Sequence, residues 1–207
     1  MTDFEALKTA VIRGSRNDVS AIVQAAIDNG EDINPILDRG MIPAMREIGE
    51  RFSRNEAYVP ELLIAARAMQ SGLALIEPLI AASGRKSIGK IAIGTVKGDL
   101  HDIGKNLVAI MLKGAGYDVI DLGVNCDLDK YEEGITRGAQ IIACSSLLTT
   151  TMTYMKDVVE HFKGKGVKVI IGGAPVTQAY ADEIGADGYS QDATGAVKLV
   201  DCLLKAC

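Results

Sequence analysis

A histidine and an aspartate two residues apart are the side chains of this sequence that best suit metal binding. His101 is one of two histidines in the chain, and Asp99 stands two residues before it. A carboxylate in this position can accept the Nδ1–H of the ring, which fixes the tautomer and makes Nε2 a better donor to a metal. One imidazole is too few for a free-standing zinc site. It is enough for a metal that a macrocycle already holds and that needs only an axial ligand, as in haem and cobalt corrinoids.

Other segments offer groups that suit a large, partly polar ligand, and each also has an ordinary explanation. Residues 145–151 are rich in serine and threonine hydroxyls, which bind polar ligands but are also typical of a polar loop and helix cap. Gly172 and Gly173 lack Cβ atoms and so leave room for a ligand, although glycines after a strand often only turn the chain. Gly104 offers similar room at the start of a predicted helix. His161 lies in a polar helical segment, where a solvated side chain is expected.

The pattern of the second half of the chain explains how these loops come together. Short apolar runs alternate there with segments of helical length, which is typical of βαβ units. Such units form a parallel, doubly wound sheet whose loops meet at the carboxyl edge, where ligands bind at the point of strand-order reversal. Residues 90–207 are therefore predicted to form a Rossmann-like or flavodoxin-like α/β domain. Its five strands are expected at 90–95, 117–121, 140–144, 167–171 and 188–190.

The first 83 residues have a helical period instead. Apolar side chains such as Val19, Val23 and Ala26 recur on one face of a predicted helix. Asn34 and Pro35 start a further helix, which Gly40 and Pro43 are expected to interrupt and restart. A long apolar stripe from residue 62 to 80 then closes at Gly84. Residues 1–83 are thus predicted to be a four-helix bundle, joined by a small, polar linker at 84–89 to the α/β domain.

Composition narrows the function classes. A chain with 48% hydrophobic and 24% charged residues can bury a globular core, and 207 residues allow one large domain or two modest ones. The net charge of -5 and the lack of Lys/Arg runs argue against nucleic acid as a partner. No leader pattern and no run of about eighteen apolar residues is present, so a cytoplasmic protein without a membrane span is expected. The four cysteines lack C-x-x-C spacing, which argues against a disulfide framework or a zinc knuckle.

Three motifs in a fixed order resemble those of a known family. The pattern D-x-H-x-x-G at 99–104 is followed by S-x-L at 145–147 and G-G at 172–173, each at the end of a predicted strand. This set resembles the cobalamin-binding domains of methionine synthase and of corrinoid methyltransferase systems. The N-terminal half is similar to the helical cap domain that precedes this fold in methionine synthase and in the small corrinoid proteins of methanol, methylamine and methoxyaromatic metabolism. The resemblance thus spans nearly the whole chain.

The resemblance implies a cofactor, cobalamin or a related corrinoid, and roles for particular residues. His101 would replace the cofactor's own lower base on cobalt, and Asp99 would accept the other ring proton. Thr151 stands where family members carry a serine, and it would extend a proton relay. Tyr58 matches the position of an aromatic side chain over the methyl group, although an ordinary bundle residue fits there equally well.

The same resemblance places further residues around the cofactor. Ser145 and Thr149 would bond its nucleotide tail, the glycine pair would give the tail room, and the loop that ends at Ala193 would close over its base. The residues expected to contact the cofactor are Gly98, Asp99, Leu100, His101, Asp102, Ile103, Gly104, Ser145, Leu147, Thr149, Gly172, Gly173, Ala193 and Tyr58.

A methyl carrier is the function that the resemblance implies. Such a protein passes a methyl group on cobalt from a substrate-specific methyltransferase to a second methyltransferase whose acceptor is tetrahydrofolate or a thiol, and a reductive activase is a further expected partner. The chain carries no nucleophile elbow, phosphate-binding loop or zinc thiolate cluster, so it reads as a carrier subunit rather than a self-contained enzyme. Three alternatives stay open: a cobalamin-dependent gene regulator, the small subunit of an adenosylcobalamin mutase, and a flavodoxin-like domain that binds a flavin or nothing.

Overall fold

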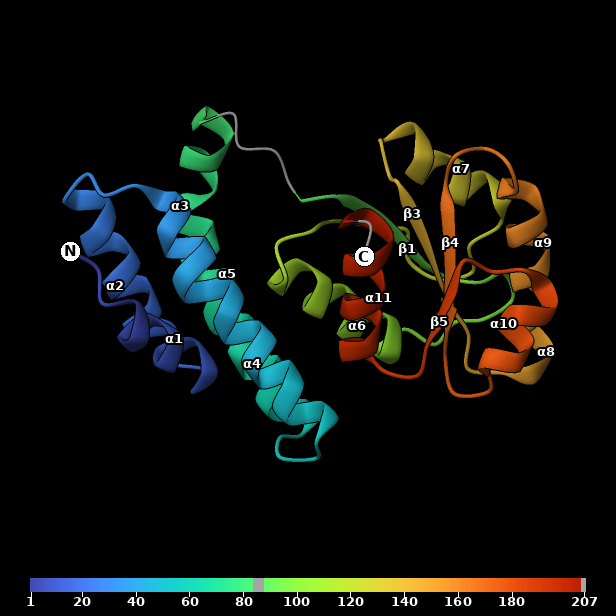
Figure 1. The fold of residues 1–207 in the computed structure, drawn as a ribbon, viewed down its shortest axis with the longest axis horizontal. Helices are drawn as coiled ribbons and strands as arrows, with labels where there is room; N and C mark the ends of the chain where they lie inside the picture. The colour runs from blue at the N-terminus through green and yellow to red at the C-terminus, as the bar shows by residue number, and fades with distance from the viewer. Residues whose placement is uncertain (84–87, 206–207) are drawn as a thin grey trace. The chain divides into compact units, whose positions relative to one another are not determined.

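The computed structural model describes residues 1–83 and 88–205, and these form two compact units (Figure 1). The first unit holds the helices up to Ser83, and the second begins just before the first strand. Residues 84–87 of the predicted linker lie outside the described residues, as does the predicted helix end at Gly84. Ile88 and Gly89 lead directly into the first strand.

The first unit is all helical. The side chain of Asp3 caps its first helix by accepting hydrogen bonds from the backbone N–H groups of Glu5 and Ala6 at 3.1 and 3.0 Å. The second and last helices of the unit pack against each other, with Val19 and Val23 of the second helix beside Gly72 of the last. Apolar burial of this kind is what stabilises short helices. The helices are α1 (Phe4–Ile12), α2 (Arg16–Asp28), α3 (Ile33–Pro35), the π-helix η1 (Ile36–Met41), α4 (Ile42–Ser53) and α5 (Val59–Ser83).

The expected interruption at Gly40 and Pro43 is wrong, because the chain stays helical from α3 through η1 to α4. In the wider π-helical turn, the N–H of Ile42 donates to the carbonyl of Leu37, five residues back. A Cβ atom on Gly40 would lie 2.6 Å from Cδ2 of Leu7 in α1. Gly40 therefore allows two helices to approach closely rather than ending one.

Helix α5 is long and apolar. By length and composition alone, its segment Val59–Leu79 could cross a membrane. The same properties suit the core helix of a bundle, and α5 packs against α1, α2 and α4. Its side chains Leu62, Met69 and Ile76 are buried in the helical unit. The apolar character of α5 therefore has an explanation inside this unit.

The second unit is the predicted doubly wound sheet. All five strands are parallel, in the order β2-β1-β3-β4-β5, with α6 and α11 on one face and α7, α9 and α10 on the other (Figure 1). Each predicted strand begins within one residue of the observed one, so the predicted fold class is confirmed. The elements are β1 (Lys90–Thr95), α6 (Ile103–Gly114), β2 (Asp118–Asp121), α7 (Leu128–Thr136), β3 (Ile141–Ser145), α8 (Thr149–Met152), α9 (Tyr154–Phe162), β4 (Lys168–Gly172), α10 (Gln178–Ile184), β5 (Gly188–Ser190) and α11 (Ala193–Lys205).

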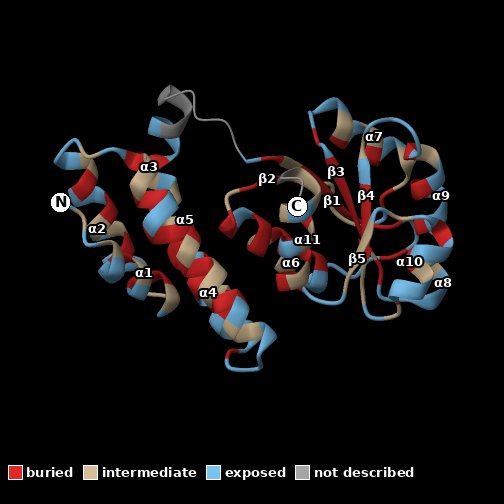
Figure 2. Cartoon of the chain, viewed as in Figure 1, coloured by how far each residue is buried: buried red, intermediate tan, exposed pale blue. Residues whose placement is uncertain are grey.

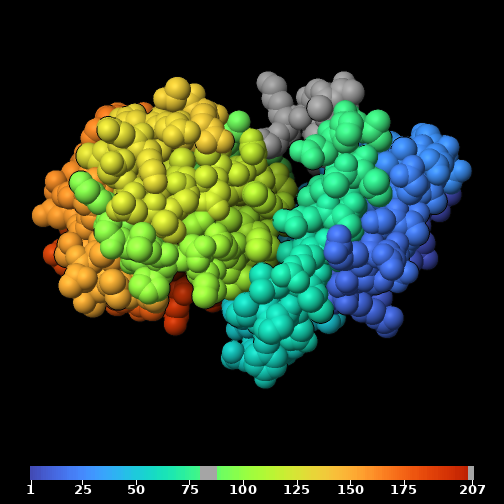
Figure 3. Space-filling view, turned by 180° about the vertical axis from the view of Figure 1, so that it is seen from behind, coloured from blue at the N-terminus to red at the C-terminus, as the bar shows by residue number. Residues whose placement is uncertain are grey.

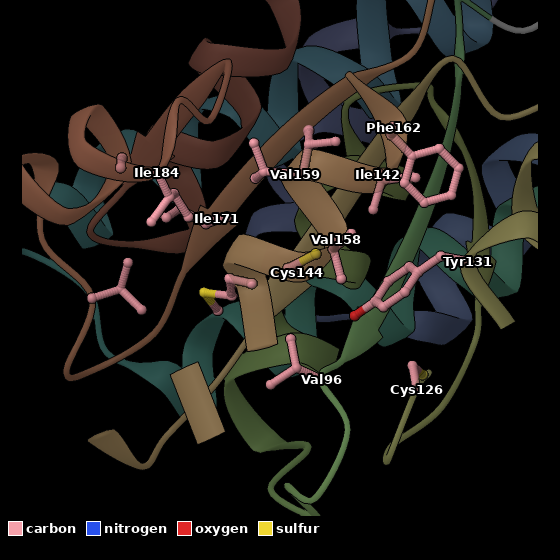
Figure 4. Close-up of a cluster of buried hydrophobic side chains, with 14 residues drawn as sticks. Val96, Cys126, Tyr131, Ile142, Cys144, Val158, Val159, Phe162, Ile171 and Ile184 are labelled. Atoms are coloured by element: carbon pink, nitrogen blue, oxygen red, sulfur yellow. The ribbon is translucent and has the colours of Figure 1, made fainter. Parts of the chain in front are cut away.

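The core of this unit lies between the sheet and its covering helices, and the central strands are buried (Figure 2). On the side of α7 and α9, the fully buried Tyr131 and Phe162 pack with strand residues such as Ile142 (Figure 4). Cys126 and Cys144 belong to the same cluster, and burial raises the pKa of their thiols to about 11 and about 12. Both side chains are therefore neutral, apolar core groups at pH 7.

The strand order reverses at β1. The chain passes from β1 to β2 on one side and from β2 across to β3 on the other. The loops that follow β1 and β3 are therefore neighbours at the carboxyl edge, at the position where open α/β sheets bind ligands. These are the loops that carry the D-x-H-x-x-G and S-x-L motifs.

Candidate cofactor site

The carboxylate of Asp99 joins the two loops at the carboxyl edge of the sheet. Its side chain is completely buried and accepts five hydrogen bonds from the two neighbouring loops. Oδ1 contacts the backbone N and the ring Nδ1 of His101, at 3.0 and 2.8 Å. Oδ2 accepts from the N–H of Leu147 at 2.8 Å, from Oγ1 of Thr151 at 2.8 Å and from Oγ of Ser146 at 3.1 Å. The predicted Asp99–His101 pair is thus present, and the loops after β1 and β3 are bound together through it.

These bonds keep the carboxylate charged. Burial by itself raises the pKa of Asp99, but the bonds from the backbone N–H groups, the His101 ring and the Thr151 hydroxyl lower it by more. The net result is a pKa well below the usual range. An ionised carboxylate accepts hydrogen bonds only, so Nδ1 of His101 must be the donor. Nε2 is then the ring nitrogen left for a metal, on a side chain that is 51% exposed.

A hydrogen bond and a tight turn hold the backbone around His101 in place. The hydroxyl of the buried Thr95, at the end of β1, donates to the carbonyl of His101 at 2.8 Å. Gly98 has a φ of +83°, a left-handed conformation that glycine adopts without strain. The tight turn at Gly98 lets the chain double back, so that Asp99 enters the interior while His101 stays at the surface.

The two loops that Asp99 joins also expose four large apolar side chains. Leu100 and Ile103, on either side of His101 in sequence, are 71% and 81% exposed, and Leu147 and Leu148 of the neighbouring loop are 44% and 43% exposed. Exposed apolar groups gathered around a polar donor are typical of a ligand site. The arrangement fits a broad, flat, largely apolar macrocycle that needs one nitrogen ligand at its centre. In the described ranges, no group of three or more His, Cys, Asp or Glu side chains is placed to hold a metal ion unaided.

The glycine pair has a structural role, and the room that it is predicted to give the cofactor tail stays a prediction. Gly173 has a φ of +133°, and a Cβ atom there would lie 1.8 Å from the carbonyl oxygen of Ser146. A Cβ atom on Gly172 would lie 2.9 Å from the carbonyl oxygen of Ser190. Both glycines are thus required by the protein's own backbone. Among the four glycines predicted at the site, only Gly104 would place a Cβ atom with nothing within 4 Å.

Substitutions can separate the two reasons for glycine at position 173, which are its positive φ and the close backbone contact. We expect Gly173→Ala to lower the free energy of unfolding by about 3 kcal/mol, because it adds a backbone clash to an unfavourable φ. Gly185→Ala is the matched control, since Gly185 has a φ of +74° but no atom within 4 Å of an added Cβ. That variant should lose only about 1 kcal/mol. Equal losses in urea unfolding of the two variants would contradict the clash.

Comparison with known proteins places the whole chain in one family. Residues 89–198 match the family described as B12 binding domain, and residues 3–77 match a second family of the same description. A corrinoid protein of Desulfitobacterium hafniense (strain Y51) is 40% identical over 212 residues, covering 99% of this chain and 98% of that protein. The chain belongs to the B12-binding corrinoid proteins.

Other members of this corrinoid protein family are named for methylamine substrates. A dimethylamine corrinoid protein of Methanosarcina barkeri is 41% identical over 202 residues, covering 94% of this chain and 93% of that protein. Among solved structures, the methanol:cobalamin methyltransferase complex MtaBC from Methanosarcina barkeri is similar with a TM-score of 0.87 and 26% identity. That match covers 98% of this chain and 79% of the other. The Asp99–His101 pair lies within the segment that matches the B12 binding domain, residues 89–198.

The remaining predicted residues of this corrinoid protein lie at the following places. Ser145 is the last residue of β3 and pairs with Thr95 and Gly172 in the sheet. Thr149 is exposed at the start of α8, and Ala193 is buried at the start of α11. Their contacts with a cofactor stay predictions.

Tyr58 lies in the helical unit of the corrinoid protein, immediately before α5. Its side chain is 68% exposed, and its backbone N–H donates to Oε2 of Glu61 at 2.6 Å. An exposed tyrosine is not needed for the packing of its own unit. Its predicted place over the methyl group stays a prediction.

Three residues that contact the Asp99–His101 loop or the helix after it were missed by sequence reasoning. Ser146 places its hydroxyl on Asp99 at 3.1 Å. Lys105, one residue after the motif, is a buried charge, and Asn125, after β2, contacts the loop that carries His101. A lysine directly after D-x-H-x-x-G and an asparagine in a predicted turn were the available signals, but neither specifies a partner.

Proposed function

We propose that this protein carries a methyl group between a substrate-specific methyltransferase and a second, acceptor methyltransferase, with Nε2 of His101 as the lower ligand of the corrinoid cobalt. The observation that carries the proposal is the 2.8 Å contact from Nδ1 of His101 to the buried Asp99. That contact leaves Nε2 as the only ring donor for a metal, on a loop that also exposes Leu100 and Ile103. When bound, the corrinoid supplies the cobalt that accepts and donates the methyl group.

The residues of the chain have separate tasks in this proposal. Leu100 and Ile103 would offer apolar surface to the cofactor, and the imidazole of His101 would hold its metal. Asp99 holds the ring in its Nδ1–H tautomer. A proton that reached Asp99 through the hydroxyl of Thr151 would weaken the contact with Nδ1 and so reduce the donor strength of Nε2.

The relatives support the partners in this proposal. The matched solved complex contains a methanol:cobalamin methyltransferase, and several relatives are named for dimethylamine or trimethylamine. A partner methyltransferase that methylates the carrier is thus the first expected partner. An acceptor methyltransferase and a reductive activase are the further partners that we propose.

Electron paramagnetic resonance of the Co(II) state tests the axial ligand directly. The chain has only two histidines, so ¹⁵N-histidine labelling marks just His101 and His161. In a His161→Gln background, every labelled nitrogen belongs to position 101. We expect superhyperfine splitting from one nitrogen that changes its pattern between ¹⁴N- and ¹⁵N-histidine protein.

Two outcomes would contradict the proposal. A splitting that is insensitive to the label would place the nucleotide base of the cofactor on cobalt instead. An apoprotein that stays colourless after refolding or incubation with cobalamin would show that the protein does not bind this cofactor. Methyl transfer is then measured separately, by mixing the loaded protein with methanol- and methylamine-specific methyltransferases and following the absorbance of the corrinoid.

A further inference from the structure

We infer that the segment from Asp121, the last residue of β2, to Asn125 is a positioning clamp that holds the His101 loop in its ligating shape before any cofactor binds. This inference rests on the proposed role of His101 as a ligand. The clamp segment contributes contacts at both ends of the stretch from Gly98 to Lys105, and it contributes no group to the Asp99 carboxylate itself.

The first grip lies just before His101. The side-chain Oδ1 of Asn125 accepts the N–H of Gly98 at 2.8 Å, and the backbone N–H of Asn125 donates to the carbonyl of Asp99 at 3.0 Å. Asn125 is one of two described non-glycine residues with a positive φ, here 50°. Asparagine is among the few side chains that tolerate this conformation. The left-handed turn lets one residue bind backbone groups of two successive residues of the ligand loop, Gly98 and Asp99.

The second grip lies just after the loop. Lys105, in the first turn of α6, is only 2% exposed, and its Nζ lies 2.6 and 2.7 Å from the two carboxylate oxygens of Asp121. Oδ1 of Asp121 also accepts the N–H of Gly123 at 2.9 Å, which fixes the carboxylate to the clamp segment. A buried ammonium without a partner is strongly unfavourable, so Lys105 keeps the start of α6 against the end of β2.

Side chains extend this second grip toward the ligand. Nζ of Lys105 also donates to Oδ1 of Asn106 at 2.7 Å, and Nδ2 of Asn106 donates to Oδ2 of Asp102 at 3.0 Å. Asp102 is the residue next to His101. A chain of polar contacts thus runs from the clamp segment to the neighbour of the ligand.

The reason that a clamp is needed lies in the exposure of the loop. Leu100 and Ile103 point their side chains to the surface, and the imidazole is half exposed, so these residues contribute little packing of their own. The shape of the loop therefore depends on Asp99 in its middle and on the grips at its ends. The residues from α6 to α7, coloured green to yellow, form one continuous face of the α/β unit (Figure 3). A metal ligand has to be held to within about 0.5 Å to act well.

Substitution of Asn125 tests the first grip. Asn125→Gly keeps the left-handed backbone and removes only the Oδ1 acceptor, whereas Asn125→Asp keeps an acceptor there. In the apoprotein, we expect Asn125→Gly to speed amide hydrogen exchange at Gly98 and His101, and Asn125→Asp to restore slow exchange. After loading, the glycine variant should bind cobalamin about tenfold more weakly, the lower end of the effect of removing groups that orient a metal ligand. Asn55→Gly, at the other positive φ of 59°, is the matched control and should change neither quantity.

Substitution at the two ends of β2 tests the second grip. Asp121→Asn removes the charge that Lys105 contacts, while Asp118→Asn removes a comparable partner of Lys90, 3.0 Å away at the start of the same strand. We expect weaker cobalamin binding and a broader Co(II) spectrum for Asp121→Asn alone. Wild-type cobalamin affinity and wild-type exchange in both Asn125→Gly and Asp121→Asn would overturn the clamp. The absence of histidine coupling in the wild-type protein would instead overturn the proposed function, and the exchange rates of the apoprotein would still decide whether the loop is clamped.

Discussion

His101→Ala is expected to remove the nitrogen splitting from the Co(II) spectrum and to weaken cobalamin binding by at least 10–100-fold, the loss seen when only an orienting neighbour of a metal ligand is removed. The apoprotein should remain folded. The imidazole is half exposed, and its main polar contact is one hydrogen bond to Asp99. The free energy of unfolding should therefore fall by only about 1–2 kcal/mol. Equilibrium binding of cobalamin and urea unfolding of the apoprotein measure the two effects.

The control for this substitution is His161→Ala. That histidine lies on α9, where its ring contacts Glu132 at 2.6 Å. Its substitution should affect neither cobalamin binding nor the Co(II) spectrum. Free imidazole added to His101→Ala should restore part of the nitrogen splitting, because the vacated position is open to solvent. Unchanged affinity of His101→Ala, without added imidazole, would show that the cofactor is held without this residue.

Asp99→Ala should be the most destabilising single change at the site. It removes an acceptor that serves five donors in a fully buried position. The N–H groups of His101 and Leu147 and the hydroxyl of Ser146 would lose their bonds to it. At about 1–3 kcal/mol for each buried group left unsatisfied, offset by local rearrangement, we expect a loss of about 4–5 kcal/mol in urea unfolding. Asp99→Asn, which keeps the shape and one acceptor oxygen, should lose less.

The pH dependence of this loss has a definite sign. The folded-state pKa of Asp99 lies below its ordinary value of 3.8, so its carboxylate stabilises the fold above that value. The contribution is then lost as the pH falls below about 4 toward the folded-state pKa. Wild-type stability should therefore decline between about pH 4 and pH 2 more steeply than that of Asp99→Asn, with a constant difference from pH 6 to pH 8. Parallel curves over the acid range would contradict the low pKa.

The same variant tests the relay. If protons reach Asp99 through Thr151, the pH dependence of histidine ligation should change in Asp99→Asn and in Thr151→Val. Ligation that responds to pH as in the wild type in both variants would exclude the relay and leave Asp99 as a purely orienting group.

Much of the α/β unit could be predicted because its signals are local. The strand from residue 90 to 95 and the short strand at 188–190 were predicted with their observed bounds, since apolar runs between turn residues are read from neighbours in sequence. The role of Gly40 could not be read in this way. It depends on Leu7, which is 33 positions earlier and packs against it from another helix.

The site shows the same division. The pairing of Asp99 with His101 follows from a spacing of two residues and was predicted. The contact of Ser146 with Asp99 was not, because it depends on the residue at which β3 ends and the chain turns toward Asp99. The clash that requires Gly173 involves a carbonyl from a neighbouring loop, so no local pattern could reveal it.

The two hydroxyls that contact Oδ2 of Asp99 can change the number of hydrogen bonds that this oxygen accepts. Ser146 and Thr151 lie 2.8 Å from each other, and each also lies 3.2 Å from the carbonyl oxygen of Leu148. Each hydroxyl has a single proton and three acceptors within reach. Rotation about a C–O bond can therefore change how many donors the aspartate receives while every heavier atom stays in place. The strength with which Asp99 accepts the Nδ1–H of His101 can therefore change within the time of a bond rotation, without any opening of the structure.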